Sequence, residues 1–394
     1  MSDTAKLLEA FKNNNFQEAR EILKDKVNIP ESLEPYERIR LFELLIKGKA
    51  FDIILFFFDH RLIETDLYEY QKFSNTLIRD MFLFLKEDEE DMGFLDDVLS
   101  RLENIDEPVD GQTLISYVFE VGAGSFLLRR LIAGGCDPAW VNNAEQTYLH
   151  QVARNNSIRL ELALAYASTL IEAGVDVNAA DIAQKTALYY TIDRNKLPLV
   201  ELLLENGAQI NLPDSASETG FYKAIVDQQS LALYEKFCEY ESPDFTISNN
   251  NGETILFQYL KRIGRPAADG MGLLNRLIQD GADFYAPSIY YGKEKTPAAL
   301  LAELPFVVFE NVLKQDVIDI SHLDSNGNSI LHQVCAYDVN YDQEEAKDTY
   351  RKVKLLIEKG ADVNQTNNAD QTAATLALTD NLKAKTVELL IKNK

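Results

Sequence analysis

The chain has 394 residues, 46% of them hydrophobic, and its 63 acidic residues outweigh 39 basic ones to give a net charge of −24. So acidic a surface repels nucleic acid and anionic lipid, which argues against both as partners and favours a basic one. Cys136, Cys238 and Cys335 form no disulfide pattern, the longest apolar run, Ile53–Phe58, is too short to span a bilayer, and the N-terminus lacks a secretion signal. We therefore expect a cytoplasmic protein without a membrane segment.

Residues 1–107 keep apolar residues at helical spacing but lack glycine turns. Three helical pairs are expected, one joined by Asn13-Asn14-Asn15, one around Gly48-Lys49 and one between Leu77 and Leu102. Their spacing of about 35 residues predicts degenerate repeats that act as a helical cap, because a terminal repeat has only one neighbour. A separate N-terminal helical domain is the alternative.

The most acidic segment runs from Lys86 to Asp110 and includes Glu87-Asp88-Glu89-Glu90-Asp91. Two interpretations are open. The segment is a solvated loop and helix face, or it is a docking strip for a partner rich in Lys and Arg.

From residue 108 onward one pattern recurs. Its copies are Gly135–Leu149, Gly174–Leu188, Gly207–Phe221, Ser242–Leu256 and Gly360–Ala374. In each copy the residue twelve positions after the leading Gly or Ser is Thr, and the residue seven positions after it is Asp or Asn. Each Gly follows an apolar helix end, where it suits a left-handed cap, and each Thr can cap the next helix. A period of about 33 residues indicates a repeat array.

Three insertions interrupt the period. Arg262–Gly272 and Tyr337–Tyr350 lengthen the links between the two helices of a repeat. The third lies in a turn, because fifteen residues rather than twelve separate Gly281 from Thr296. Loops that depart from the length of their own repeat are common places for function.

Thr147-Tyr148-Leu149-His150 and Ser329-Ile330-Leu331-His332 resemble the Thr-Pro-Leu-His tetrapeptide of the ankyrin repeat family, and Thr296-Pro297 keeps its proline. Matches begin at Thr113, Thr147, Thr186, Thr219, Thr254, Thr296, Ser329 and Thr372, so residues 108–394 resemble an ankyrin repeat array. The resemblance implies an all-α solenoid of stacked helix pairs with short β-hairpin-like fingers. It also implies that His150 and His332 hydrogen-bond the capping residue and the neighbouring turn backbone.

The resemblance further places partner contacts on a concave face of fingers and first helices, at the sixth, eighth, ninth and eleventh positions after the Gly. The matching side chains are Val141, Asn143, Gln146, Ile182, Lys185, Ser215, Glu218, Asn250, Glu253, Asn368 and Gln371. The long finger adds Tyr285, Tyr290 and Tyr291. Trp140 either fills a gap between fingers or anchors a partner, because aromatic rings dominate interface energetics.

No motif indicates catalysis. His332 and Cys335 lie three residues apart without a second pair of metal ligands, and Gly122–Ser125 lacks the strand and lysine of a phosphate loop. We therefore expect no catalytic residue, no metal and no cofactor. The expected function is binding of another protein by a monomeric interaction module.

One hypothesis is an inhibitor, such as a bacterial immunity protein that neutralises a basic toxin. Alternatives are a host-targeting effector or scaffold that recruits proteins, and an enzyme whose site lies in residues 1–107. The acidity also fits a simpler explanation, in which charge only keeps the array soluble and monomeric.

Overall fold

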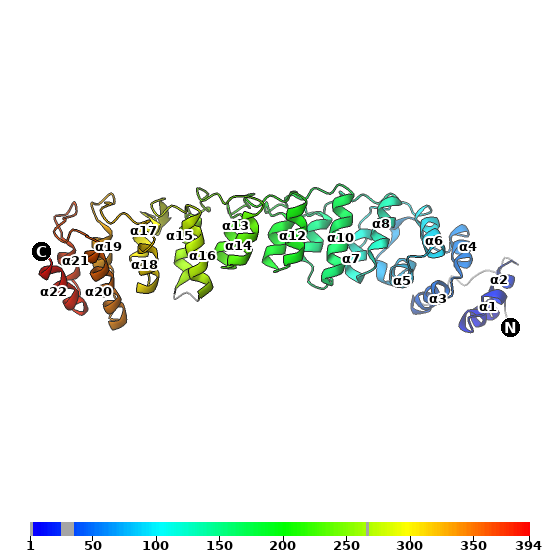
Figure 1. Cartoon of the computed structure of the whole chain (residues 1–394). Coiled ribbons are helices and arrows are strands. Elements are labelled where there is room, and N and C mark those ends of the chain that lie inside the picture. The colour runs from blue at the N-terminus through cyan, green and yellow to red at the C-terminus, as the bar shows by residue number, and fades with distance from the viewer. Residues whose placement is uncertain (1–2, 25–34, 265–267) are drawn as a thin grey trace. The chain divides into compact units, whose positions relative to one another are not determined.

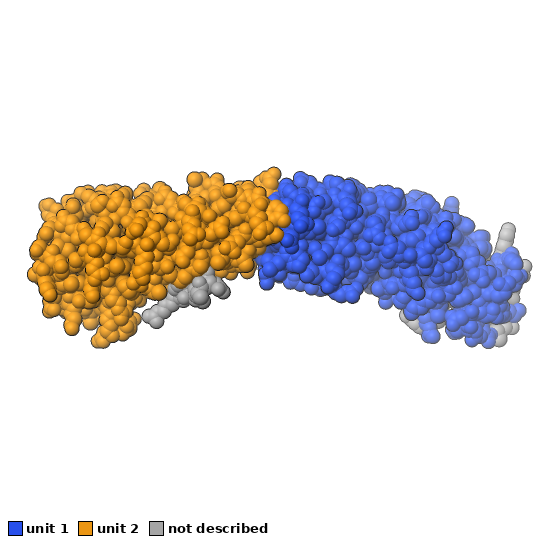
Figure 2. All heavy atoms as spheres, in the orientation of Figure 1, with its two compact units in different colours: residues 1–208 blue, residues 209–394 orange. Residues whose placement is uncertain are grey.

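The computed structural model describes residues 3–24, 35–264 and 268–394, which form mostly short helices (Figure 1). The chain divides into two compact units, Met1–Ala208 and Gln209–Lys394 (Figure 2).

The three N-terminal helical pairs expected from the sequence are present in the first unit. They are α1 (Asp3–Lys12) with α2 (Phe16–Lys24), α3 (Pro35–Lys47) with α4 (Phe51–Asp59), and α5 (Leu77–Phe84) with α6 (Glu89–Leu99). Two 3₁₀ turns, η1 (Leu67–Glu69) and η2 (Phe73–Asn75), precede α5. Helices α3 and α4 contact α5 and α6, which in turn contact the first repeat. The domain boundary at residue 107 stays a prediction.

Eight further helix pairs follow. Their first helices are α7 (Leu114–Val121), α9 (Tyr148–Arg154), α11 (Ala187–Asp193), α13 (Gly220–Tyr222) continued by the π-helical η3 (Lys223–Asp227), α15 (Ile255–Ile263), α17 (Pro297–Leu301), α19 (Ile330–Ala336) and α21 (Ala373–Ala377). Their second helices are α8 (Ser125–Ala133), α10 (Leu160–Glu172), α12 (Leu197–Glu205), α14 (Leu231–Cys238), α16 (Ala268–Gln279), α18 (Phe306–Leu313), α20 (Gln343–Glu358) and α22 (Ala384–Lys392), with the 3₁₀ turn η4 (Asn381–Lys383) before α22.

The residues that recur in the sequence mark where these helices begin and end. All eight first helices start directly after a Thr or Ser, whose hydroxyl or whose capping box with a His satisfies main-chain N–H groups of the first turn. Glycines in the left-handed conformation follow five of the eight second helices, with φ of 88° at Gly174 and 91° at Gly360, for example. Both expectations are confirmed.

Within each unit, first helices pack against first helices and second helices pack against second helices. In the first unit α7 contacts α9, α9 contacts α11, and α8, α10 and α12 form the second row. In the second unit α15, α17, α19 and α21 form one row, while α18, α20 and α22 follow one another in the other. Each buried face is apolar: Val152 and Leu170 in the first unit and Phe257 and Val312 in the second are fully buried. Burying one such side chain stabilises the fold by roughly 1.5–3 kcal/mol.

The finger of residues 281–296 is longer than the others, as expected, and it alone among the described fingers forms a two-stranded hairpin. Strand β1 (Ser288–Tyr290) pairs antiparallel with β2 (Lys293–Lys295), with Ile289 opposite Glu294. In some other fingers the strand pairing is reduced to one isolated β-bridge, such as that between Ala180 and Thr186.

The other two insertions both lengthen helices. The link expected at Arg262–Gly272 is mostly helical, because residues 262–263 end α15 and residues 268–272 begin α16, while residues 265–267 lie outside the described part of the chain. The insertion at Tyr337–Tyr350 was also expected to lengthen a link, and this prediction is wrong for residues 343–350. Residues 343–350 instead extend α20 at its N-terminal end, because Asp342 caps the helix by accepting N–H groups from Glu344 and Glu345.

Candidate functional site

Six of the described fingers are held by an Asp or Asn, which in five of them lies seven residues after the leading Gly or Ser. Asp181 Oδ1, for example, accepts the main-chain N–H groups of Ala183 (2.8 Å) and Lys185 (3.1 Å). The same pair of bonds is made by Asn142, Asp214, Asn249, Asp324 and Asn367. A side-chain acceptor that satisfies two turn amides makes the finger rigid before any partner binds.

Main-chain hydrogen bonds also join neighbouring fingers. In the second unit Asn250 N–H donates to Ala216 O (3.0 Å), Ile289 N–H to Gly252 O (2.9 Å) and Asn368 N–H to Asn326 O (3.0 Å). Between the long finger and the next one, residues 319–328, the structure has no such main-chain bond. The row of fingers in this unit is therefore interrupted at one described place.

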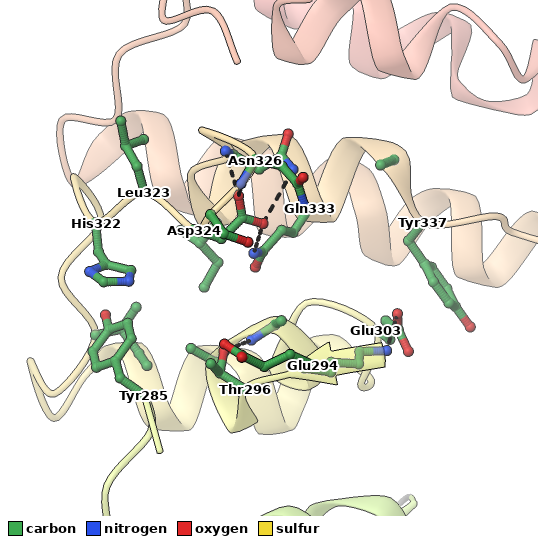
Figure 3. Close-up of a pocket in the computed structure, with 18 of the residues that line it drawn as sticks. Tyr285, Glu294, Thr296, Glu303, His322, Leu323, Asp324, Asn326, Gln333 and Tyr337 are labelled. Carbon is green, nitrogen blue, oxygen red and sulfur yellow. Dashed lines mark hydrogen bonds and ion pairs between the residues drawn. The ribbon is translucent and has the colours of Figure 1, made fainter. Parts of the chain in front are cut away.

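A groove of about 680 Å³ opens at this interruption. Glu294 and Thr296 lie on one side of it and Asp324 and Asn326 on the other (Figure 3). We call it the acidic groove. It is lined by Tyr285, Glu294, Lys295, Thr296, Ala298, Ala299, Glu303, Ile318, Asp319, His322, Leu323, Asp324, Ser325, Asn326, Asn328, Ile330, Gln333, Ala336, Tyr337, Asp338 and Asn340.

The lining carries five carboxylates, Glu294, Glu303, Asp319, Asp324 and Asp338, against one ammonium group, Lys295. The ammonium pairs with Glu303 at 2.6 Å. Within the described residues the other four carboxylates make no ion pair. The groove therefore holds a surplus of negative charge that no ion pair among the described residues neutralises.

Hydrogen bonds keep two of these carboxyl groups ionised. Those from the Ser321 hydroxyl (2.6 Å) and main-chain N–H (2.9 Å) lower the pKa of Asp319. Partial burial acts to raise the pKa of Asp324, but hydrogen bonds from Asn328, Gln333 and Asn326 outweigh it and leave that pKa below its usual value. Both groups carry full charge at neutral pH.

Aromatic side chains stand at both ends of the groove (Figure 3). At one end the Tyr285 ring lies against His322, with ring centroids 4.3 Å apart, and the Tyr285 hydroxyl accepts the N–H of Asp319 at 2.8 Å. At the other end lies Tyr337, where burial raises the pKa of the hydroxyl. Carboxylates flanked by aromatic rings suit Lys or Arg side chains, which make ion pairs and cation–π contacts.

The two histidines of the recurring tetrapeptides act inside the array. Thr147 N–H donates to Nδ1 of His150 at 3.1 Å, so Nε2 donates to Lys185 O at 2.9 Å. Burial lowers the pKa of His150, which keeps the ring neutral. His332 makes the equivalent bonds to Ser329 and Gln365, as the sequence predicted. No group of three or more His, Cys, Asp or Glu side chains placed to hold a metal occurs among the described residues.

Two family models match the sequence. "Ankyrin repeats (3 copies)" matches residues 117–214, and "Ankyrin repeat" matches residues 326–368. These parts of the chain are ankyrin repeats. Similar solved structures include the ankyrin repeat domains of Bcl-3, a unique member of the IkappaB protein family, and of human ASB11. Each is 18% identical and covers 63% of this chain and 98% of its own, with TM-scores of 0.49 and 0.43, respectively. The comparison with curated proteins gives no match.

The predicted contact residues, several of which lie in these ankyrin repeats, fall into three groups. Asn143, Ile182, Asn250 and Tyr291 are exposed, whereas Trp140, Lys185, Glu218, Tyr285 and Tyr290 are half-buried. Gln146 and Glu253 are buried, because Gln146 donates to Asp181 of the next finger and Glu253 pairs with Lys261 at 2.6 Å. Those two offer a partner little surface, and we remove them from the proposed contacts.

Trp140 packs within the ankyrin array. Its ring stacks on Tyr148, with centroids 5.7 Å apart and an angle of 21° between the ring planes, and Tyr148 is fully buried. This contact favours the interpretation in which Trp140 fills a gap. Its role as a binding anchor stays a prediction.

Several carboxylates of the acidic segment, residues 86–110, form ion pairs with Lys and Arg side chains of the same chain. Glu87 pairs with Arg129 at 2.8 Å, Asp96 with Arg130 at 3.2 Å, and Asp88 with Lys49 at 2.9 Å. These pairs favour the solvated helix face over a docking strip.

Of the predicted contact residues, only Tyr285 lines the acidic groove. Glu294, Asp319, Asp324, Tyr337 and Asp338 were missed, because the family resemblance gives contacts at fixed positions in each finger and only aromatic residues were added to them. A signal was present, since Glu294 lies in the long finger and Tyr337 and Asp338 lie in the second insertion. No described helix is long and apolar enough to cross a membrane.

Proposed function

We propose that this chain binds a basic protein partner one-to-one through the acidic groove. Ankyrin repeats are protein–protein interaction modules. The observation that carries the finer proposal is the set of four carboxylates that no described cation neutralises, in a groove between rigid fingers. A preorganised site loses little conformational entropy on association, so its ion pairs contribute directly to affinity.

The proposal extends to inhibition. A net charge of −24 complements a basic protein that acts on nucleic acid, and occupying the basic surface of such a toxin would block its access to substrate. A scaffold or host-targeting effector that recruits a basic protein is the second candidate, and the same groove supports it. An enzyme with its site in residues 1–107 is the least favoured, since the groove lies elsewhere.

The test compares a groove variant with a charge-matched control. The groove variant is Glu294→Gln/Asp319→Asn/Asp338→Asn, in which the amides keep the size of each side chain. The control is Glu161→Gln/Glu172→Gln/Glu205→Gln, which changes exposed carboxylates of the first unit by the same total charge. The probe is a blocked heptapeptide of alternating Arg and Val, with an alternating Glu and Val peptide for comparison.

Calorimetry at 50 mM NaCl should show binding of the Arg peptide only. The groove variant should bind it at least about tenfold more weakly than the control does, since each lost charge-assisted bond costs about 1.5 kcal/mol or more. Equal affinity of the two variants would mean that binding reflects net charge and not the groove. A candidate basic toxin that remains active with a molar excess of the protein would argue for recruitment over inhibition.

A further inference from the structure

The long finger presents an unpaired strand edge to the groove. Ile289 N–H donates to Gly252 O at 2.9 Å, away from β2, so Ile289 occupies a non-hydrogen-bonded position of the hairpin. Glu294 is its register partner and has the same kind of position. Because positions alternate along an antiparallel pair, the N–H and C=O of Glu294 point away from β1, on the side where β2 borders the groove.

The opposite side of the groove carries a main-chain N–H group that makes no hydrogen bond among the described residues. Ser325 follows Asp324 as Asn250 follows Asn249 and as Asn368 follows Asn367. In those two fingers the N–H of this residue donates to the preceding finger. The N–H of Ser325 has no hydrogen-bond partner among the described residues.

The space around three turn glycines also shows which neighbouring fingers touch. A Cβ on Gly252 would lie 3.0 Å from Ile289, and one on Gly327 would lie 2.9 Å from Asn368 N, so these turns touch the finger that follows. A Cβ on Gly292, in the turn of the long finger, would meet no heavy atom within 4 Å. The tips of the fingers are thus in contact on either side of the groove and separated across it, while the Tyr285 side chain joins the long finger to the next one at one end of the groove.

We propose that an extended, basic segment of the partner adds as a strand to the open edge of β2 and lies between β2 and residues 324–328. Its main chain would bond the N–H and C=O of Glu294 on one edge and the N–H of Ser325 on the other. It would complete the row of fingers where the chain leaves it interrupted. Addition of a strand provides affinity through main-chain bonds and specificity through alternate side chains.

Charge selects the occupant of this edge. Side chains of alternate residues in such a strand face Glu294, Asp319 and Asp338, which favours Arg or Lys at every second position. The strand is short, and its charged Lys293, Glu294 and Lys295 discourage pairing with a second copy of the chain. The groove volume of about 680 Å³ lies within the usual range of binding sites.

This inference rests on the proposed function, and its test separates the two. The probe is the same Arg–Val heptapeptide, made also with N-methyl groups on every Arg or on every Val amide. N-methylation keeps the charge but removes the donors of one strand edge. On the protein, Glu294→Pro removes the edge N–H and is compared with Glu294→Gln, which matches its loss of charge. Proline is tolerated in an edge strand whose N–H makes no internal bond.

The peptide N–H groups that face Glu294 O belong to alternate residues, so we expect the methylated peptide that lacks these donors to bind the unaltered protein about tenfold or more weakly than the parent peptide does. We also expect Glu294→Pro to bind the parent about tenfold more weakly than Glu294→Gln. Equal binding of all three peptides would overturn strand addition and leave the basic groove intact, and it would do so even if Glu294→Pro failed to fold. No binding of the parent peptide at all would contradict both proposals.

Discussion

Three lysine side chains of the array donate hydrogen bonds to carbonyl groups at the ends of preceding helices. Lys196 Nζ reaches Asn155 O at 2.7 Å, Lys352 Nζ reaches Ala302 O at 3.0 Å, and Lys383 Nζ reaches Cys335 O at 3.0 Å. The last carbonyls of a helix lack partners within it and attract positive charge. These lysines therefore hold one repeat to the next, at the expense of a buried charge.

The first prediction concerns Lys352, which is 1% exposed and whose pKa burial lowers to about 8. Because the unfolded chain binds the proton more tightly, the wild type should gain stability relative to Lys352→Met as the pH rises from about 8 to about 10.5. The gain should be on the order of 3 kcal/mol. Urea unfolding of both proteins at several pH values measures it. A pH-independent difference between them would contradict the buried charge.

Tyr291 is 89% exposed and adopts φ of 49° at the tip of the hairpin, followed by Gly292 at 72°. A two-residue turn with two positive φ angles favours Asn-Gly, and a bulky residue there is strained. The second prediction is that Tyr291→Asn raises the free energy of unfolding by about 0.5–1 kcal/mol.

The same substitution should weaken binding of a basic partner if Tyr291 is a contact, since truncating an anchor costs about 2 kcal/mol. Denaturation and calorimetry on one preparation provide both values. Unchanged affinity with increased stability would remove Tyr291 from the proposed contacts.

At the scale of elements, the contact between fingers gives the third prediction. Gly292 and Gly327 both have positive φ, so alanine at either position should cost about 1–2 kcal/mol. At Gly327 the new Cβ would also lie 2.9 Å from the main-chain nitrogen of Asn368. Gly327→Ala should therefore lower the urea midpoint clearly more than Gly292→Ala. Similar midpoints would show that the fingers at 324–328 and 367–371 are not in contact.

The second insertion shows how local signals compete with family patterns. Asp342 followed by Glu344 and Glu345 is a helix-start signal, and the structure uses it to begin α20. Repeat length predicted a loop across the whole insertion, so the helix-start signal was given too little weight. The residues left as a link, 337–341, are the ones that bring Tyr337 and Asp338 to the groove.

For the whole molecule, a net charge of −24 predicts steering of a basic partner. The fourth prediction is that raising NaCl from 50 to 500 mM slows association about tenfold or more, because long-range attraction is screened. The groove variant Glu294→Gln/Asp319→Asn/Asp338→Asn should mainly accelerate dissociation. Stopped-flow or surface-based kinetics separate the two rates. An association rate independent of salt would argue that the acidity serves solubility alone.

Much of the repeat architecture was predictable from the sequence because each unit repeats the same local chemistry. Thr and Ser caps, glycine turns and the Asp or Asn of most fingers act within about a dozen residues, so their spacing marked five repeats, and the Thr or Ser that begins the first helix marked the other three. The histidine bonds followed from the tetrapeptides and the family resemblance. Contact positions within fingers transferred less well, because Gln146 and Glu253 pair with other side chains and become buried.

The sequence by itself thus determined the helix pairs, their caps and the acidic character of the surface, since these depend on neighbours along the chain and on composition. Only the tertiary structure decided where the row of fingers is interrupted and which carboxylates remain without a cation. Both depend on distances between residues that lie tens of positions apart, such as Glu294 and Asp324, or Arg130 and Asp96. Packing of one repeat against the next sets those distances, and no local pattern encodes them.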